Sequence, residues 1–480
     1  PGWNLRSLYP VGFSPQYGNV QNDLQLVGGL RGEITPKLRW DISASYGRNA
    51  IDYSLKNSIN ASLGPASPTD FDLGRLTQTE KNANADFNYE WEVGALSKPI
   101  NVAFGGELRQ ETYQVRAGDP ASYAVGPGAA AGLEANSNGA PGFSASQAGQ
   151  WSQRSKAAYV DMEVPLGERW SIGAASRYED FSSFGSTLDG KLSARFAITP
   201  DVALRGTVSS GFRAPTPAQL NTTSTTQGLD TRTLQIFTSG RLSPNDPLAQ
   251  LLGAKPLKPE ESRTASLGLT WRTDLGLSGS VDVYQIKLTD RFSQSASFAI
   301  PAGTPNPLGY TSVNYFTNDF DTTTTGVDVV GNYLGVLGAG RMTLTLAYNF
   351  NRTRVDNGST SVATNETQRV LFEDRLPEHK GSLTSSWDIG AWSLMARMRY
   401  YGAWTDSSGN AVGDIYQRFG AMSFLDLAVG YRINEHHSLR VGADNVFDRY
   451  PDEATFQASR GLVYSRNAPY DTDGANLYAQ

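Results

Sequence analysis

Apolar and polar residues alternate along much of this chain with the two-residue period of a β-strand. From Met342 to Phe350, the even positions carry large apolar side chains and the odd positions carry polar or small ones. The same alternation recurs over residues 192–199, 265–272 and 425–432. Because successive side chains of a strand point to opposite faces, each segment is predicted to be a strand with one apolar and one polar face.

The pattern predicts about 17 such strands, joined by connections of two kinds. The strands are expected to begin near Leu24, Arg39, Ala83, Asn101, Ala157, Ser171, Leu188, Val202, Arg263, Ser278, Val313, Arg341, His379, Trp392, Ser423, Leu439 and Asn476. Short turns, such as Thr199-Pro200-Asp201, alternate with long connections. The long connections cover residues 57–80, 117–154, 216–258, 293–311, 355–376, 405–420 and 451–473, and only 182–185 is brief.

This alternation of connections indicates an all-β, antiparallel, up-and-down transmembrane barrel. Successive connections of such a barrel lie at opposite ends, so the short turns would share the periplasmic end and the long loops the extracellular end. Large aromatic residues beside the predicted short turns would form a girdle at one membrane interface. They are Trp40, Trp91, Trp170, Trp271, Trp392, Tyr333 and Tyr431. A soluble β array is the alternative, but it would show a repeat period or short loops at both ends.

Composition fits a barrel and excludes several other classes. The 480 residues have a mean hydropathy of −0.38 and no run of about 20 apolar residues, so a helical membrane span is not expected. The chain has no cysteine, which excludes a disulfide scaffold and thiolate metal sites. A net charge of −6 without a basic stripe gives no electrostatic case for nucleic acid.

No enzymatic motif is visible, and we predict no catalytic residue, cofactor or metal site. His379 lies just below the long loops, whereas His436 and His437 lie in a predicted periplasmic turn, so the three cannot act together. Asp471 and Asp473 precede Gly474 in a pattern more typical of a plain turn than of a calcium loop.

Four ordered motifs resemble those of TonB-dependent receptors. Gly211-Phe212-Arg213-Ala214-Pro215 is similar to the GFRAP segment of that family, and Leu257 to Ser262 to its LKPE-x-S element. Thr325 to Asp328 resembles its KGVE-like element, and Asn445-Val446-Phe447-Asp448 its N-L-F-D element. Glycine, proline, asparagine and aspartate also end strands and cap turns, so we assign these motif residues a structural role.

The resemblance implies an outer-membrane transporter of a Gram-negative bacterium. Its long loops would bind a scarce substrate, and a plug inside the barrel would be rearranged by the TonB–ExbB–ExbD complex. A ferric siderophore is the expected substrate; cobalamin or an oligosaccharide imported by the same mechanism remains an alternative. A passive porin and a surface adhesin are the rival classes. Outer-membrane lipid and lipopolysaccharide would surround the wall.

Aromatic and cationic residues in the loops and upper lumen are candidates for substrate contact by stacking and charge-assisted hydrogen bonds. They are Arg109, Tyr123, Trp151, Arg213, Phe237, Tyr310, Trp404 and Tyr416.

Residues 1–480 are expected to form a single but incomplete barrel domain. Bacterial barrels have an even number of strands, and the plugged transporters have about 22, so first strands and a plug with its TonB-contacting segment are expected before Pro1. Asn476 to Gln480 is shorter than the roughly 9–11 residues of a membrane strand, so the last strand is expected to be cut short.

Overall fold

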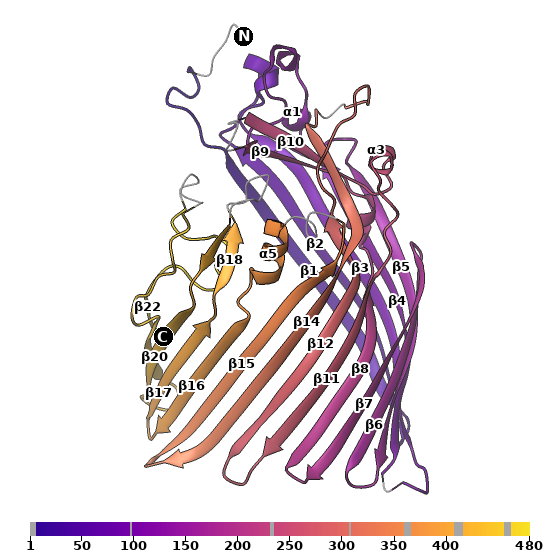
Figure 1. The fold of residues 1–480 in the computed structure, drawn as a ribbon, viewed down its shortest axis with the longest axis vertical. Helices are drawn as coiled ribbons and strands as arrows, with labels where there is room; N and C mark the ends of the chain where they lie inside the picture. Colours follow the sequence, from indigo (N-terminus) through magenta and orange to yellow (C-terminus); the bar gives the residue numbers. More distant parts are fainter. Residues whose placement is uncertain are drawn as a thin grey trace.

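Long antiparallel strands form one sheet of 20 strands in the computed structural model (Figure 1). The structure describes residues 6–96, 98–230, 235–306, 309–359, 366–407, 416–455 and 462–480, with side chains for all of these except 228–230, 235–237 and 367. Three of these 20 strands, β9, β10 and β13, belong to the loops, which leaves 17 wall strands among the described residues. This arrangement confirms the predicted fold class.

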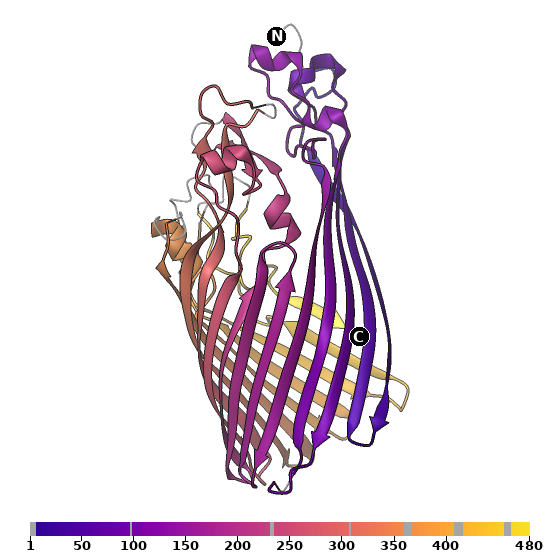
Figure 2. The same cartoon turned by 90° about the vertical axis from the view of Figure 1, so that its right-hand side faces the viewer.

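Wall strands pair with their neighbours in chain order. The order runs from β1 to β8, then β11, β12, β14 to β17, and β20 to β22, and every pairing is antiparallel. The strands wrap around a common axis, with β1 to β8 on the near side and β15 to β20 on the far side of Figure 2. Within the described residues, β1 pairs with β2 alone and β22 with β21 alone.

The bounds of the wall strands agree with the predicted starts over most of the chain. The strands are β1 (Gln16–Thr35), β2 (Leu38–Lys56), β3 (Phe71–Trp91), β4 (Ile100–Ala117), β5 (Gly149–Leu166), β6 (Trp170–Phe181), β7 (Gly185–Thr199), β8 (Val202–Arg213), β11 (Glu260–Arg272), β12 (Leu277–Gln294), β14 (Ser312–Leu337), β15 (Gly340–Asn357), β16 (His379–Ile389), β17 (Trp392–Tyr401), β20 (Met422–Arg432), β21 (Ser438–Asp444) and β22 (Asn476–Ala479). The exceptions are β1, β3 and β5, which begin well before the expected residues.

The connections alternate between the two ends of the wall as predicted. The predicted short turns lie at the lower end of Figure 1, and the long loops lie at the upper end, together with the brief connection 182–184 between β6 and β7. The loops carry β9 (Ser224–Asp230), β10 (Gln235–Leu242), β13 (Phe298–Ala299), β18 (Trp404–Ser407), β19 (Tyr416–Phe419), α1 (Pro120–Tyr123), α2 (Pro217–Asn221), α3 (Pro247–Leu251), α5 (Glu366–Asp374) and the 3-10 helices η1 (Ala61–Ala66) and η2 (Pro127–Ala131).

The polar face of the wall is its concave, inner face. Along β5, Gln153, Ser155 and Ala157 are buried, whereas their neighbours Arg154 and Lys156 are exposed. Side chains converge on the inside of a curved sheet and diverge on the outside, so the buried set points inward. The outward set includes large apolar residues such as Leu192 and Leu267, which would lie against lipid.

Buried apolar clusters lie in the extracellular loops. One joins β10, α3 and the start of β14 through Leu242, Ala249 and Val313. Another surrounds Trp404 and Phe419 of the β18–β19 hairpin. The barrel has no dry core to fill, because its apolar side chains face outward, so ordinary hydrophobic burial is left to the loops.

No described helix has both the length and the apolar character needed to cross a membrane.

Candidate functional site

The GFRAP motif ends β8 and leads the chain back across the mouth of the barrel. Phe212 packs edge-on against Phe181, with ring centroids 5.6 Å apart, and Pro215 is fully buried. Thr216 then caps α2, because its hydroxyl accepts from the Gln219 amide while the Gln219 side chain accepts from the Thr216 amide. The motif thus folds the loop inward over the upper lumen.

A polar cavity of about 310 Å³ lies beneath this segment. Its lining includes Arg109, Glu111, Gln153, Glu179, Phe181 and Arg213. Two residues predicted as ligand contacts, Arg109 and Arg213, are therefore brought together in one cavity. They come from β4 and β8, which are four strands apart in the wall, so only the inward fold of the loop unites them.

Arg109 is neutralised by carboxylates. Its guanidinium lies 2.9 Å from Glu80 and also pairs with Glu111. On β6, two strands along the wall from β4, Arg177 pairs with Glu107 at 2.7 Å and with Glu179 at 3.0 Å. Four carboxylates face two guanidiniums on this part of the inner wall, so it keeps a negative surplus that favours cationic over anionic groups.

Arg213 is held above this cavity in an ion pair. Its Nε lies 2.9 Å from Glu260, and its guanidinium carbon lies 5.1 Å from the centre of the Phe292 ring. Glu260 also accepts from the Phe292 backbone amide at 2.6 Å. The pair therefore ties together the upper ends of β8, β11 and β12.

Arg291, which the sequence did not single out, lies on the same inner face without a carboxylate partner. The register of β12 shifts between Leu288 and Arg291, where Asp290 adopts a left-handed conformation with φ of 55°. The bulge turns Arg291 inward, between the rings of Phe320 and Phe372, at 5.3 Å and 5.0 Å. It donates to Thr322 at 3.0 Å, and Glu260 acts on its charge only at longer range, since no described carboxylate lies within ion-pair distance.

Arg241 is a second half-buried cation without a carboxylate among the described residues. Its guanidinium lies 5.1 Å from the centre of the Phe316 ring. Gln294, with its amide oxygen turned toward the guanidinium, accepts two hydrogen bonds of 2.7 Å and 3.1 Å. Burial lowers the pKa of Arg241, as expected for a charge that no described carboxylate offsets. Alternation alone gives no signal for Arg241 or Arg291, because loop pairing and a bulge position them.

Two predicted contacts are packed inside loops. Trp404 is 1 % exposed; its ring stacks on Phe419 at 4.5 Å, and its indole N–H donates to the Tyr470 hydroxyl at 3.2 Å. Tyr310 is 9 % exposed and is linked to Thr225 at 3.2 Å and Gln147 at 3.4 Å. Both shape the loops in this conformation, and their contact with a ligand stays a prediction.

The other predicted contacts are spread around the mouth. Trp151 lies on the inner face of β5, opposite Tyr113 of β4. Tyr123 ends α1 and is half-buried, and Tyr416 begins β19 and is exposed. Phe237 belongs to β10, but its side chain lies outside the described residues.

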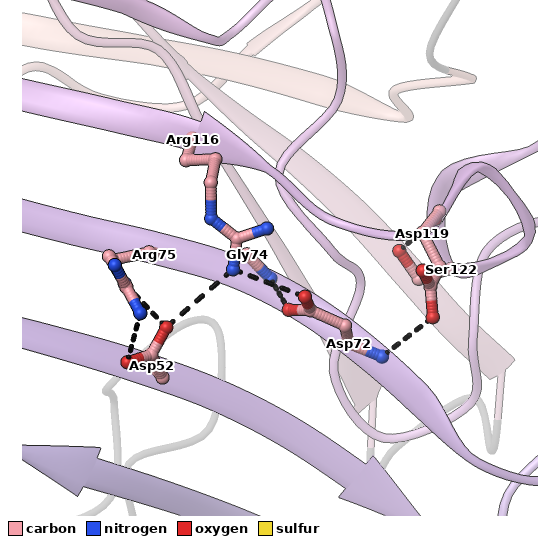
Figure 3. A network of polar contacts seen from close by, with 7 residues as sticks. All are labelled: Asp52, Asp72, Gly74, Arg75, Arg116, Asp119 and Ser122. Atoms are coloured by element: carbon pink, nitrogen blue, oxygen red, sulfur yellow. Dashed lines mark hydrogen bonds and ion pairs between the residues drawn. The ribbon is translucent and has the colours of Figure 1, made fainter.

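A network of charged residues anchors the loop between β4 and β5 (Figure 3). Arg75 holds Asp52 through two hydrogen bonds of 2.6 Å and 2.9 Å. Arg116 contacts Asp72 at 3.1 Å, and Asp119 accepts from the Asp72 amide at 2.9 Å. Gly74 adopts a φ of +107°, and a Cβ there would lie 2.4 Å from the Arg116 carbonyl oxygen, so only glycine fits.

The Asn445 motif forms a turn around a buried carboxylate. The Asn445 side chain donates to the Arg449 carbonyl at 2.8 Å and accepts from its amide at 3.0 Å. Its backbone amide donates to Asp426, and Asp448 accepts from the Ala475 amide. Phe447 points outward and is 69 % exposed. The motif residues thus fix the turn after β21.

No cluster of three His, Asp or Glu side chains suited to a metal ion occurs in the part of the chain that the structure describes. His379 starts β16, while His436 and His437 lie in the turn between β20 and β21.

A curved antiparallel wall with an apolar outer face, short turns at one end and a polar mouth at the other defines an outer-membrane barrel receptor. The family described as TonB dependent receptor-like, beta-barrel, matches residues 2–446. The chain therefore belongs to the TonB-dependent receptor family, as its motifs predicted.

Relatives and solved structures agree with this assignment. The chain is 23% identical over 305 residues to the iron-regulated outer membrane virulence protein of two Vibrio cholerae strains. That match covers 62% of this chain and 42% of the relative, so it spans less than half of the curated protein.

Solved siderophore receptors share the fold at low sequence identity. A mutant ferric enterobactin receptor of Pseudomonas aeruginosa superposes with a TM-score of 0.60 at 14% identity, covering 98% of this chain and 70% of that one. The siderophore receptor PirA of Acinetobacter baumannii gives a TM-score of 0.57 at 14% identity, covering 97% and 70%. The ferric-catecholate import receptor Fiu of E. coli K12 gives 0.60 at 12% identity, covering 96% and 64%.

Proposed function

We propose that this chain is the barrel of a transporter that imports a ferric siderophore in a TonB-dependent step. The observation that carries the proposal is the pair of half-buried guanidiniums, Arg241 and Arg291, at the extracellular mouth of a barrel of this family. Each lies over phenyl rings and lacks a described carboxylate partner. An anionic aromatic chelate would supply both the missing negative charge and further stacking surface.

The comparisons support the same substrate class. One similar curated protein is named as iron-regulated, and the similar solved structures are named as ferric enterobactin, ferric-catecholate and siderophore receptors. Coupling to TonB follows from the family. The ExbB and ExbD partners, the N-terminal plug and the surrounding lipopolysaccharide remain predictions.

Cobalamin or oligosaccharide import remains the alternative by the same mechanism, and passive diffusion through a porin is the rival class. A neutral oligosaccharide would not need two guanidiniums that lack an ion-pair partner among the described residues. A porin would pass solutes without TonB.

The test is uptake by cells that express the full-length protein and lack other iron receptors. Cells are offered ⁵⁵Fe-labelled catecholate and hydroxamate siderophores, labelled cobalamin, or a labelled oligosaccharide, with and without TonB. Saturable, TonB-dependent ⁵⁵Fe uptake supports the proposal. Accumulation that does not depend on TonB, or uptake of cobalamin or oligosaccharide alone, contradicts it.

The two arginines provide a sharper arm of the experiment. Arg241→Gln and Arg291→Gln should each raise the siderophore concentration needed for half-maximal binding by at least about tenfold, since a charge-assisted hydrogen bond contributes about 1.5–3 kcal/mol. Arg75→Gln is the matched control, because Arg75 is already paired with Asp52. Equal binding by all variants would remove these arginines from the site.

A further inference from the structure

The pairing of β12 with β14 contains a bulge that decides which way Arg291 faces. Leu288 lies opposite Thr322 and Arg291 opposite Phe320, so β12 has one residue more than β14 over this interval. An extra residue in one strand re-aims the side chains that follow it. Below the bulge the odd positions of β12, such as Val283, point outward, and Arg291 is also odd but points inward. Without the bulge, alternation would place Arg291 on the outer face.

The bulge depends on an unfavourable backbone conformation at Asp290. Its φ of 55° lies in the left-handed region, which a residue with a Cβ rarely adopts. Such a conformation persists only where the surrounding structure holds it, and the backbone groups that leave the strand ladder need other partners. The Asp290 amide finds one in Asp321, at 3.0 Å. Whatever else holds Asp290 also sets the direction of Arg291.

Two side chains hold the peptide groups on either side of Arg291. Before it, the Asp290 carbonyl accepts from Asn318 Nδ2 at 2.7 Å. After it, the Phe292 amide donates to Glu260 Oε1 at 2.6 Å. Glu260 is also the partner of an arginine in the cavity below, so its replacement would disturb two features at once. Asn318 is the simpler of the two supports.

The Asn318 carboxamide also joins the bulge to the segment that resembles the LKPE-x-S element. Its Nδ2 donates to the Lys258 carbonyl at 2.8 Å, and its Oδ1 accepts from the Lys258 amide at 2.9 Å. The carboxamide thus bonds both backbone groups of one residue, as a neighbouring strand would. With the Asp290 carbonyl, both of its N–H groups are used. Asn318 therefore connects β14 with the start of β11 across the bulge in β12.

The Lys258 side chain contributes less than its backbone. Its Nζ lies 3.0 Å from Asp290, but the two side chains are 65% and 39% exposed, so water screens the ion pair. The Asn318 side chain is half-buried, and its three hydrogen bonds go to backbone groups. The carboxamide, rather than the lysine charge, is the main support of the bulge.

We propose that Asn318 is a positioning residue for Arg291. By holding the left-handed Asp290, it turns the Arg291 guanidinium toward the mouth of the barrel, while its own side chain bonds the backbone and not the ligand. The role of Arg291 in binding an anionic chelate rests on the proposed function. The direction in which Arg291 points can be measured without any ligand.

Asn318→Asp is the informative substitution. It keeps the shape of the side chain and the oxygen that accepts from Lys258, but it replaces both N–H donors by an oxygen that faces two carbonyls. The bulge should then relax, and position 291 should follow the alternation of β12. It would join Val283, Gln285 and Lys287, which are exposed, whereas Arg291 is half-buried.

The first experiment measures the direction of position 291. Arg291→Cys is introduced into the full-length protein, with any cysteine outside residues 1–480 replaced by serine, and its rate of reaction with a water-soluble maleimide is measured. Asn318→Asp should raise this rate several-fold. Asn332→Asp is the matched control, because Asn332 also lies on β14 but accepts from Thr345, away from the bulge. An unchanged rate with Asn318→Asp, or an equal rise in the control, overturns the proposal. Heat-modifiable migration selects the folded barrels.

The second experiment connects position with binding of the ⁵⁵Fe-labelled catecholate siderophore. Asn318→Asp should raise the concentration for half-maximal binding about as much as Arg291→Gln does, and should add nothing when Arg291 is already replaced. An equal loss in both backgrounds would show a general loosening of the mouth and overturns the proposal. If Arg291→Gln leaves binding unchanged while Asn318→Asp still speeds labelling, Asn318 does position Arg291 and the proposed function is what fails.

Discussion

Whether a residue stands at an odd or an even position of its strand decides whether its side chain meets lipid or water. On β15, Leu346 points outward and faces Gly331 and Leu383 across the strands, whereas Thr345 points inward and donates to Asn332 at 3.1 Å. The two positions are adjacent in sequence and opposite in environment. A pair of identical substitutions can therefore separate a membrane wall from a soluble sheet.

Leu346→Arg is expected to destabilise the barrel by about 2–4 kcal/mol, and Thr345→Arg is expected to be tolerated. Leu346 lies about 10 Å above the Met342–Trp387 pair at the short-turn end, near the bilayer midplane, so its replacement would place a charge in hydrocarbon. Reversible unfolding of the full-length protein in lipid measures both. Equal costs for the two variants would contradict the assigned faces.

Tyr310 predicts a pH dependence of the loops. Burial raises the pKa of Tyr310, with a smaller opposing effect from its hydrogen bonds to Thr225 and Gln147. Because the pKa of Tyr310 is higher in the folded than in the unfolded protein, the neutral phenol stabilises the folded loops fully below the unfolded pKa of about 10. This stabilisation is lost as the pH rises through the folded pKa.

The Tyr310 hydroxyl links the loop that carries Gln147 to the loop that carries Thr225. These loops should therefore open reversibly above about pH 10. Hydrogen exchange over residues 117–149, compared at pH 8 and pH 11 after correction for intrinsic exchange rates, measures this opening. Tyr310→Phe is the control, since it lacks the hydroxyl and should show no alkaline transition. An identical pH response in both proteins would remove Tyr310 from the effect.

The alternation in the sequence predicts which face of a strand a residue lies on, but it does not predict which arginines have a carboxylate partner. Arg109 and Arg213 were expected at the upper lumen, and both line one cavity there. Their neutralisation by Glu80, Glu111 and Glu260 depends on cross-strand register and on the fold of a loop, which alternation does not specify. Arg291 was missed for the same reason, because a bulge decides its face.

At the scale of elements, one buried carboxylate joins two wall strands to the turn of the Asn445 motif. Asp426 on β20 is fully buried and accepts from Arg397 and Arg399 of β17, each at 2.8 Å. It also accepts from the Asn445 backbone amide at 2.9 Å. The turn is therefore held by the wall and does not stand alone.

Asp426→Ala should destabilise the folded protein by about 3 kcal/mol, since it removes the buried acceptor that Arg397, Arg399 and the Asn445 amide share. Asp444→Ala is the matched control: Asp444 contacts Arg397 at 3.6 Å and is more than a third exposed, so its loss should cost at most about 1 kcal/mol. Denaturant unfolding in detergent compares them. Similar costs for both would show that Asp426 does not hold the turn.

Strand existence was predictable, but strand length was not. β3 begins at Phe71, although clear alternation starts only near Ala83. The upper half of β3 rises above the membrane, where both of its faces meet water or loops. This half needs no apolar face, so polar residues such as Thr77, Gln78 and Thr79 follow one another while the backbone stays paired with β2 and β4. Alternation therefore reports the part of a strand in the membrane and not its full extent.

At the scale of the whole molecule, the orientation in the membrane follows from loop length. The short-turn end carries exposed Trp91, Trp170 and Trp392, as expected for a girdle at the periplasmic interface. The opposite end carries the folded loops with their own buried clusters. These features assign the two ends independently of each other.

The absence of cysteine from the sequence makes this orientation directly testable by single-cysteine labelling. Ala130, at an exposed position of the loop between β4 and β5, and Glu435, in the turn between β20 and β21, are replaced by cysteine one at a time in the full-length protein. A membrane-impermeant maleimide should label Ala130→Cys in intact cells, because long loops of such barrels face the outside. It should label Glu435→Cys only after the outer membrane is permeabilised, and the parent protein, with any cysteine outside residues 1–480 replaced by serine, should not react at all. Labelling of Glu435→Cys in intact cells with a sealed outer membrane would reverse the assigned orientation, and with it the placement of the arginine-bearing mouth at the cell surface.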